Sequence, residues 1–192
     1  MFRRVAVLPL MPDKPGANLE AGRRLLEPIF ISELRKSEAF EIQIVTPAQL
    51  QSWTGKGGWT AEEALPGDFL SAIQKQTGCD GTLFVKLTSF QAYPPLAVGW
   101  SAKIVSTTSN NVPAAVEAMF DWSNPNVRKA AKIYIDQQFG WKDVKSREEF
   151  QENSPSRFGQ FAASQVVAKL CGREPPLKPE ESDATKTKPP AK

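Results

Sequence analysis

The residues that could do chemistry in this chain are few, and the most informative fact about them is that the sequence contains no histidine. Histidine is the commonest general base and metal ligand, so the usual catalytic triads are excluded. The two cysteines, Cys79 and Cys171, cannot build a zinc site by themselves. We therefore predict a chain with no catalytic residue, no metal and no cofactor.

The cysteines allow two interpretations. Cys79 precedes Asp80, which places a thiol beside a carboxylate, but no histidine, lysine or arginine is adjacent to generate the thiolate. We interpret Cys79 as a buried structural residue at the entrance of a strand. Cys79 and Cys171 together leave two alternatives open, one disulfide or two small buried apolar residues.

Two further patterns favour structural roles. The segment GKGG at residues 55–58 places its lysine before the last glycines with no Ser or Thr directly after it, so it does not match a phosphate-binding loop and is predicted to be a surface loop. Glu117 and Asp121 fall on one face of a predicted strand at a separation of roughly 13 Å. Paired glycosidase carboxylates need ~5–9.5 Å, so a solvated sheet edge is the better interpretation.

The aromatic residues Trp53, Trp59, Tyr93 and Trp141 fall in loops or at the ends of predicted elements. Exposed Trp and Tyr are favoured at protein interfaces because they bury a large area at low entropic cost. The alternative is that they pack over the bases of loops. We select Trp53, Trp59, Tyr93 and Pro94 as candidate contacts with a partner.

Charge and hydropathy exclude several classes of partner. The net charge of +3 arises from 24 basic and 21 acidic residues spread along the chain, which gives no basic stripe for nucleic acid. No apolar run approaches the ~20 residues of a transmembrane helix. Residues 1–4 lead directly into a strand, so no signal peptide is visible, and either a cytoplasmic location or a missing export segment fits this start.

These residues must be positioned by elements that the periodicity predicts. Residues 3–10 are a near-continuous apolar run typical of a buried strand, and residues 17–37 have helical spacing that Pro28 is expected to kink or split. The remaining predictions are strands at 40–45, 83–90, 98–104 and 112–121, and helices at 46–53, 65–77, 124–140 and 154–172.

This order predicts an α/β fold with a single mixed sheet of about five strands, a parallel βαβ start followed by an antiparallel meander, and helices packed against it. Residues 1–172 would form this domain. Residues 173–192 contain five prolines, several charges and one large apolar residue, Leu177, so we predict a disordered tail.

The chain resembles the periplasmic modules grouped around the curli-secretion lipoprotein CsgG, the TolB N-terminal domain and the LpoB-type lipoproteins. The segments that carry this resemblance are VAVLPL (5–10), SELRKS (32–37), VTPAQL (45–50), LPGDFL (65–70), GCDGTLFVKLTSF (78–90), YPPLAVG (93–99) and SPSRFGQFAASQVVAKL (154–170). The similarity runs from Val5 to Leu170, but no lipobox cysteine precedes Val5.

The resemblance implies a periplasmic domain that is often tethered to the outer membrane by a lipidated cysteine. It also implies a scaffold or interaction role in the cell envelope, with a protein partner or peptidoglycan as the binding target. Two alternatives stay open. One is a small-ligand or glycan-binding module that uses the same aromatic residues. The other is an enzyme that relies on carboxylates, lysine or serine, which clustered groups with displaced pKa values would indicate.

Overall fold

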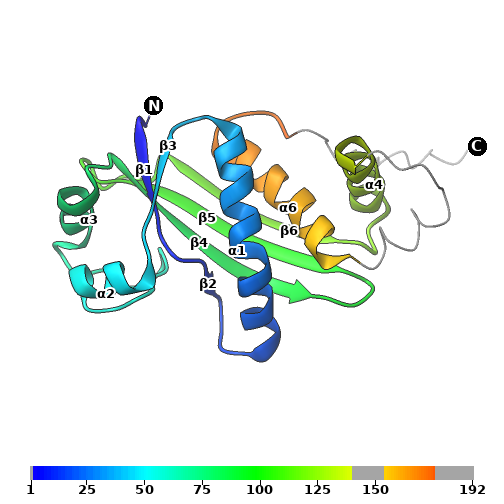
Figure 1. Cartoon of the computed structure of the whole chain (residues 1–192), viewed down its shortest axis with the longest axis horizontal. Helices are drawn as coiled ribbons and strands as arrows, with labels where there is room; N and C mark the ends of the chain where they lie inside the picture. The colour runs from blue at the N-terminus through cyan, green and yellow to red at the C-terminus, as the bar shows by residue number, and fades with distance from the viewer. Residues whose placement is uncertain (1, 140–153, 176–192) are drawn as a thin grey trace, which may run out of the picture.

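The computed structural model describes residues 2–139 and 154–175 (Figure 1). The predicted loop with Trp141, and the predicted tail beyond residue 175 with Leu177, lie outside the described residues. No helix in the described ranges is both long enough and apolar enough to span a membrane.

One mixed sheet organises the molecule, as predicted, with six strands where about five were expected. Its order is β3-β1-β4-β5-β6, and β2 pairs with β4. Pairing is parallel among β1, β3 and β4 and between β2 and β4, and antiparallel in the β4-β5-β6 meander. The strands are β1 (Arg4–Val7), β2 (Met11–Pro12), β3 (Glu41–Ile44), β4 (Gly81–Gln91), β5 (Ala97–Ser106) and β6 (Ala114–Asp121).

The first predicted strand, residues 3–10, is shorter in the structure: β1 ends at Val7, and the separate strand β2 follows at Met11. The cause is Pro9, which has no N–H to donate to a ladder. The Leu8 N–H still donates to the Leu83 carbonyl at 3.0 Å, and the chain then rejoins β4 at Met11. Hydropathy alone did not reveal this interruption because residues 5–10 are all buried.

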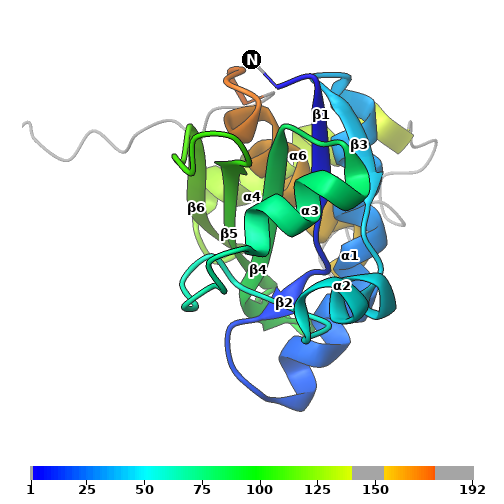
Figure 2. The same ribbon diagram turned by 90° about the vertical axis from the view of Figure 1, so that its left-hand side faces the viewer.

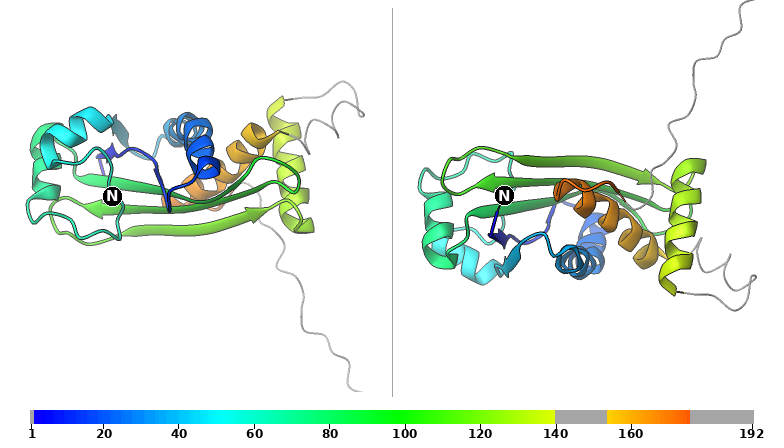
Figure 3. Two further views of the ribbon diagram at one scale, coloured as in Figure 1. Left: turned by 90° about the horizontal axis from the view of Figure 1, so that it is seen from below. Right: turned by 90° about the horizontal axis from the view of Figure 1, so that it is seen from above.

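The first face of the sheet is covered by α1 and α6, which lie side by side along it (Figure 3). The described helices are α1 (Ala17–Ser37), α2 (Pro47–Thr54), α3 (Phe69–Thr77), α4 (Pro125–Phe139) and α6 (Pro155–Leu170). Pro28 is exposed inside α1, and the helix runs through it without the split that was expected. The large core cluster on this face, to which α1 and α6 contribute, includes Trp100, whose ring centroid is 5.0 Å from that of Phe30.

Glycines set how closely these layers approach. A Cβ at Gly22 of α1 would lie 2.5 Å from Cγ of Phe90 and 2.8 Å from Cδ2 of Leu87, so the helix contacts β4 through its bare backbone. A Cβ at Gly159 of α6 would lie 2.2 Å from Cδ2 of Leu26. Both helix positions are buried, so larger side chains there would push the layers apart.

The second face is covered at one end by α2 and α3 (Figure 2). A smaller core cluster forms here from strand residues of the opposite parity, such as Ala6 and Phe84, together with Leu50 and Ile73 of the helices. Helix α2 begins with the predicted capping box at Thr46.

Helix α3 begins at Phe69, four residues later than the predicted start at residue 65. The segment before it is a turn in which the Phe69 N–H donates to the Pro66 carbonyl. Gly78 ends α3 in the left-handed conformation, with φ of 66°, as the sequence predicted.

A buried polar cluster ties α1, α4 and α6 together. The Glu33 carboxylate of α1, which is 7% exposed, accepts a hydrogen bond from Gln160 Nε2 at 3.1 Å and pairs with Lys36. Burial, followed by the nearby Glu33 charge, raises the pKa of Tyr134 in α4 to about 12. A buried carboxylate requires such partners, so this cluster fixes how the three helices meet.

The close approach at Gly22 generates a prediction. Gly22→Ala should lower the free energy of unfolding by about 1–3 kcal/mol, because the added methyl group overlaps the Phe90 ring. Alanine is the better helix former by about 1 kcal/mol, so propensity alone predicts the opposite sign. Ser32→Ala at an exposed position of α1 is the control. Urea unfolding measures both variants, and a stabilised Gly22→Ala would contradict the close contact.

Candidate functional site

The two predicted tryptophan contacts lie against the smaller core cluster near α2 and α3. Trp53 of α2 is partly buried there. Trp59, in the loop after α2, packs edge-on against Phe69 with 5.4 Å between ring centroids, and its Nε1 donates to Thr54 Oγ1 at 2.9 Å. The Lys56 ammonium lies 4.8 Å from the Trp59 ring centroid. These contacts agree with the alternative interpretation of the sequence, in which the aromatic residues pack over the bases of loops.

Tyr93 is exposed in a very different way. It lies in the short connection between β4 and β5, with 81% of its surface accessible. The Gln91 side chain donates to the Tyr93 carbonyl at 3.2 Å, and the exposed Pro94 follows. Tyr93 and Pro94 therefore form the convex tip of a hairpin, which we call the Tyr93 tip.

The structure does not bring the four predicted contacts together. The Tyr93 tip follows the Gln91–Ala97 pair of the β4–β5 ladder, at the opposite end of that ladder from the Gly81–Ser106 pair. The tryptophans lie with α2 and α3 at the other end of the sheet (Figure 1). The Tyr93 tip is thus the part of this set that has the geometry of a free contact surface.

A charged cluster covers part of the second sheet face. Lys103 Nζ lies 2.6 Å and Lys86 Nζ 3.3 Å from the Glu62 carboxylate, and Lys86 also lies 3.0 Å from Asp13. The buried Ser101 lies directly opposite Lys86 in the β4–β5 ladder. This serine and lysine form the pair of groups that most resembles catalytic apparatus among the described residues.

The electrostatics of this cluster do not favour catalysis. The hydrogen bond to Asp13, opposed by burial and supported by Glu62, raises the pKa of Lys86. The hydrogen bond from Lys103 lowers the pKa of Glu62. Both shifts favour the charged forms, whereas a lysine base needs a depressed pKa. The cluster therefore anchors the 55–63 loop to the sheet by ion pairing.

The other motifs have structural partners. Burial raises the pKa of the Cys79 thiol, which is fully buried. Burial by itself raises the pKa of Asp80, but the N–H groups of Arg3 and Arg4, at 2.9 and 3.0 Å, outweigh it and lower that pKa. Gly55 ends α2 with φ of 81°, which gives the GKGG segment a backbone role.

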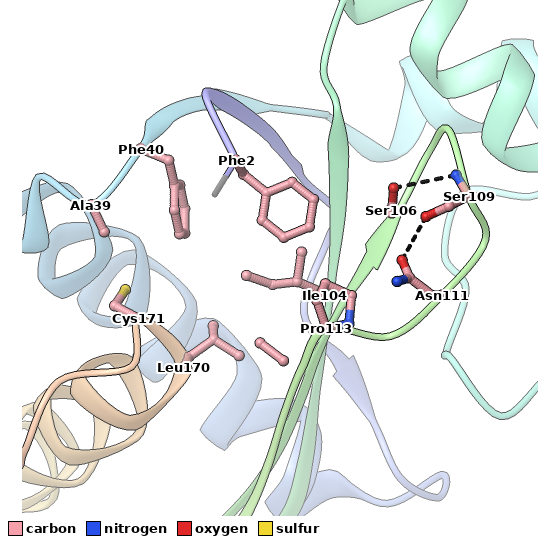
Figure 4. Close-up of a pocket in the computed structure, with 11 residues that line it drawn as sticks. Phe2, Ala39, Phe40, Ile104, Ser106, Ser109, Asn111, Pro113, Leu170 and Cys171 are labelled. Carbon is pink, nitrogen blue, oxygen red and sulfur yellow. Dashed lines mark hydrogen bonds between the residues drawn. The ribbon is translucent and has the colours of Figure 1, made fainter.

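The sequence did not reveal a pocket of about 380 Å³ near the N-terminus (Figure 4). It lies where Phe2, the connection before β3, the turn between β5 and β6, and the end of α6 meet. The lining residues are Phe2, Ala39, Phe40, Ile104, Ser106, Ser109, Asn111, Pro113, Ala114, Leu170 and Cys171. No local motif could have found this pocket, since its walls are up to 169 positions apart in the chain (171 − 2).

Comparison with known proteins identifies the fold. No family model matches the chain, and no curated protein matches its sequence. The hypothetical protein CT253 from Chlamydia trachomatis aligns over 88% of this chain and 96% of its own, with 13% identity and a TM-score of 0.50. Lipoprotein GNA1162 from Neisseria meningitidis aligns over 71% and 97% with 12% identity and a TM-score of 0.44.

The LpoB C-terminal domain from Escherichia coli also aligns, over 61% of this chain and 81% of that domain, with 11% identity and a TM-score of 0.37. At these identities the likeness concerns the fold alone. An LpoB structure is thus among those that align with the chain, and the resemblance to CsgG and TolB stays a prediction.

The lowered pKa of Glu62 predicts acid sensitivity. Its ion pairs contribute stability at pH values above the ordinary carboxylate pKa, and this contribution is lost as pH falls through the lowered pKa. Because these side chains are partly exposed, we expect Glu62→Gln to lower the unfolding free energy at pH 7 by up to about 1 kcal/mol.

Urea unfolding at pH 7 and in acid tests this expectation, and the difference between wild type and Glu62→Gln should shrink in acid. Glu117→Gln, which removes a carboxylate without an ion pair to the described residues, is the control. A difference that persists in acid would show that packing of the side chain, not its charge, accounts for the effect.

Both cysteines are free in the structure, so the disulfide is not formed, and of the two only Cys79 is buried as the second alternative expected. Cys171 is partly exposed, and burial raises the pKa of its thiol. Thiol titration without reductant should count one slowly reacting thiol in the native protein and two in guanidinium. Native reaction should accelerate as pH rises, because the thiolate is the reactive form. A count of zero in guanidinium would indicate a disulfide.

Proposed function

We propose that this chain is a non-catalytic interaction module of the bacterial cell envelope, and that it contacts a protein partner through the Tyr93 tip. The envelope placement is based on the sequence resemblance to LpoB-type lipoproteins. A periplasmic location, anchoring at the outer membrane and contact with peptidoglycan belong to the same proposal.

The observation that carries the proposal is the exposure of Tyr93. A tyrosine that is 81% exposed leaves most of a large amphipathic ring in water, where it contributes little to the stability of its own domain. The adjacent Pro94 limits the backbone freedom that a partner would otherwise have to restrict. Aromatic residues of this kind are enriched among the residues that dominate protein interfaces.

The non-catalytic part of the proposal is supported by how the reactive groups are engaged. Lys86, Lys103 and Glu62 are held in mutual ion pairs, and the Cys79 thiol is fully buried. Asp80 accepts hydrogen bonds from two backbone N–H groups. In each case the arrangement stabilises the fold.

The alternative of a glycan-binding module would need exposed aromatic faces as stacking platforms. Trp59 contacts the Phe69 ring and lies beneath the Lys56 ammonium, and Trp53 packs on the smaller core cluster. Their geometry therefore favours protein binding at the Tyr93 tip over glycan stacking on the tryptophans.

Site-specific photocrosslinking tests this proposal. A benzophenone amino acid at position 93, in the full chain expressed in its own organism, should give a discrete crosslinked species in the envelope fraction. Tyr93→Ala should weaken binding of that partner by at least tenfold, since interface aromatics of this kind contribute about 2 kcal/mol or more. The same probe at Val112, an exposed residue in the β5–β6 turn, is the control.

Two results would overturn the assignment. One is equal crosslinking of the same species from positions 93 and 112. The other is a Tyr93→Ala variant that binds the partner as tightly as wild type. Circular dichroism of each variant verifies that the fold is intact, and the exposure of both positions makes loss of folding unexpected.

A further inference from the structure

The pocket in Figure 4 has two chemically distinct sides. Phe2, Phe40, Ile104 and Leu170 direct apolar side chains toward its centre, and Phe2 and Phe40 come from different segments of the chain. The opposite rim belongs to the β5–β6 turn and contributes hydroxyl and amide groups. A pocket with apolar walls and a few convergent polar groups is the usual form of a small-molecule site, and ~300–1,000 Å³ is the usual size.

The apolar wall is held in place by the backbone. Phe2 packs over Gly81, where a Cβ would lie 2.9 Å from its Cδ1 atom. The next two residues, Arg3 and Arg4, donate their N–H groups to the Asp80 carboxylate. Residues 2–4 are therefore fixed directly beside the pocket, so the Phe2 ring is already positioned before any ligand binds.

The polar rim is also formed in advance. Ser109 Oγ donates to Asn111 Oδ1 at 2.7 Å, and the Ser109 N–H donates to Ser106 Oγ at 3.3 Å. The Ser106 N–H donates to the Asn111 carbonyl at 2.9 Å. These bonds orient the turn and leave the Asn111 amide NH₂ as a donor for a ligand.

The charge of the lining decides the class of ligand. All eleven described lining residues are uncharged. An ionised ligand group would lose hydration here without gaining an ion pair from these eleven residues, which is costly. We infer that this pocket binds an uncharged small molecule with a flat aromatic or alicyclic body between the apolar walls and a hydrogen-bonding group toward Asn111. The Tyr93 tip lies at the other end of the sheet, so this inference is independent of the proposed function.

A matched pair of fluorescent probes tests the inference. N-phenyl-1-naphthylamine is uncharged, and 8-anilinonaphthalene-1-sulfonate has the same body with an added anionic group. We expect saturable fluorescence enhancement with the uncharged probe and binding of the sulfonate at least tenfold weaker. Equal or tighter binding of the sulfonate, or no saturable binding of the uncharged probe, would overturn the inference.

Neighbouring residues of β6 provide matched variants. Ala114 lines the pocket, and Ala115, on the other side of the strand, is exposed. Ala114→Leu should fill part of the pocket and weaken binding of N-phenyl-1-naphthylamine at least tenfold, while Ala115→Leu should leave it unchanged. Equal affinities of the two variants would place the probe elsewhere and contradict the assignment.

A third measurement needs no substitution. Cys171 lines the pocket and is partly exposed, whereas Cys79 is fully buried. Saturating N-phenyl-1-naphthylamine should slow alkylation of Cys171 by iodoacetamide at least fivefold in the native wild-type chain. An unchanged rate at saturation would show that the probe does not occupy this pocket.

Discussion

The constraint on which the rest of this structure depends is that most residues of β4 and β5 are buried, on both faces of the sheet. Alternate residues of the pair enter two separate cores, with Leu83 and Ile104 in the larger and Phe84 and Val105 in the smaller. Helices must therefore cover both faces, and each face has its own pair of helices. Helices α1 and α6 cover the first face closely enough that bare glycine backbone forms the contact, and α2 and α3 cover the second at one end.

This covering also explains where polar and reactive groups are found. Beyond α2 and α3, none of the described helices packs in the smaller core cluster of the second face, and Lys86 and Lys103 lie on this face next to the buried Ser101. Glu62, from the loop before α3, forms ion pairs with both lysines, and Asp13 forms a second ion pair with Lys86. Ser101 and Lys86 could be mistaken for a catalytic serine–lysine pair. The raised pKa of Lys86 and the lowered pKa of Glu62 both favour the charged forms, so these side chains serve as ion pairs on the sheet surface.

The surfaces left for recognition are consequently at the two ends of the meander. At one end the β4–β5 turn presents a convex aromatic tip, and at the other the β5–β6 turn forms the rim of a concave pocket with Phe2 and the end of α6. Convex aromatic surfaces suit contacts with a partner that supplies the complementary hollow, whereas a concave pocket surrounds a small molecule. The two surfaces share strand β5 but no side chain, so each can act without the other.

The sequence by itself determined those features that depend on neighbours in the chain. Alternation in residues 83–104 specified the antiparallel pair, Thr46 and Gly78 marked helix ends, and the lack of histidine excluded the usual catalytic groups. Local propensity also predicted two elements that are longer than those in the structure. Pro9 interrupts an apparently continuous strand, and α3 begins only after Pro66 and Gly67. Only the tertiary structure decided which aromatic residues are free. Trp59 and Tyr93 both fall in predicted loops. In the structure Trp59 packs against Phe69 of α3, whereas Tyr93 is exposed to solvent. The pocket likewise required Phe2, Phe40, Asn111 and Leu170 to converge, and long-range packing, which no local pattern encodes, brings them together.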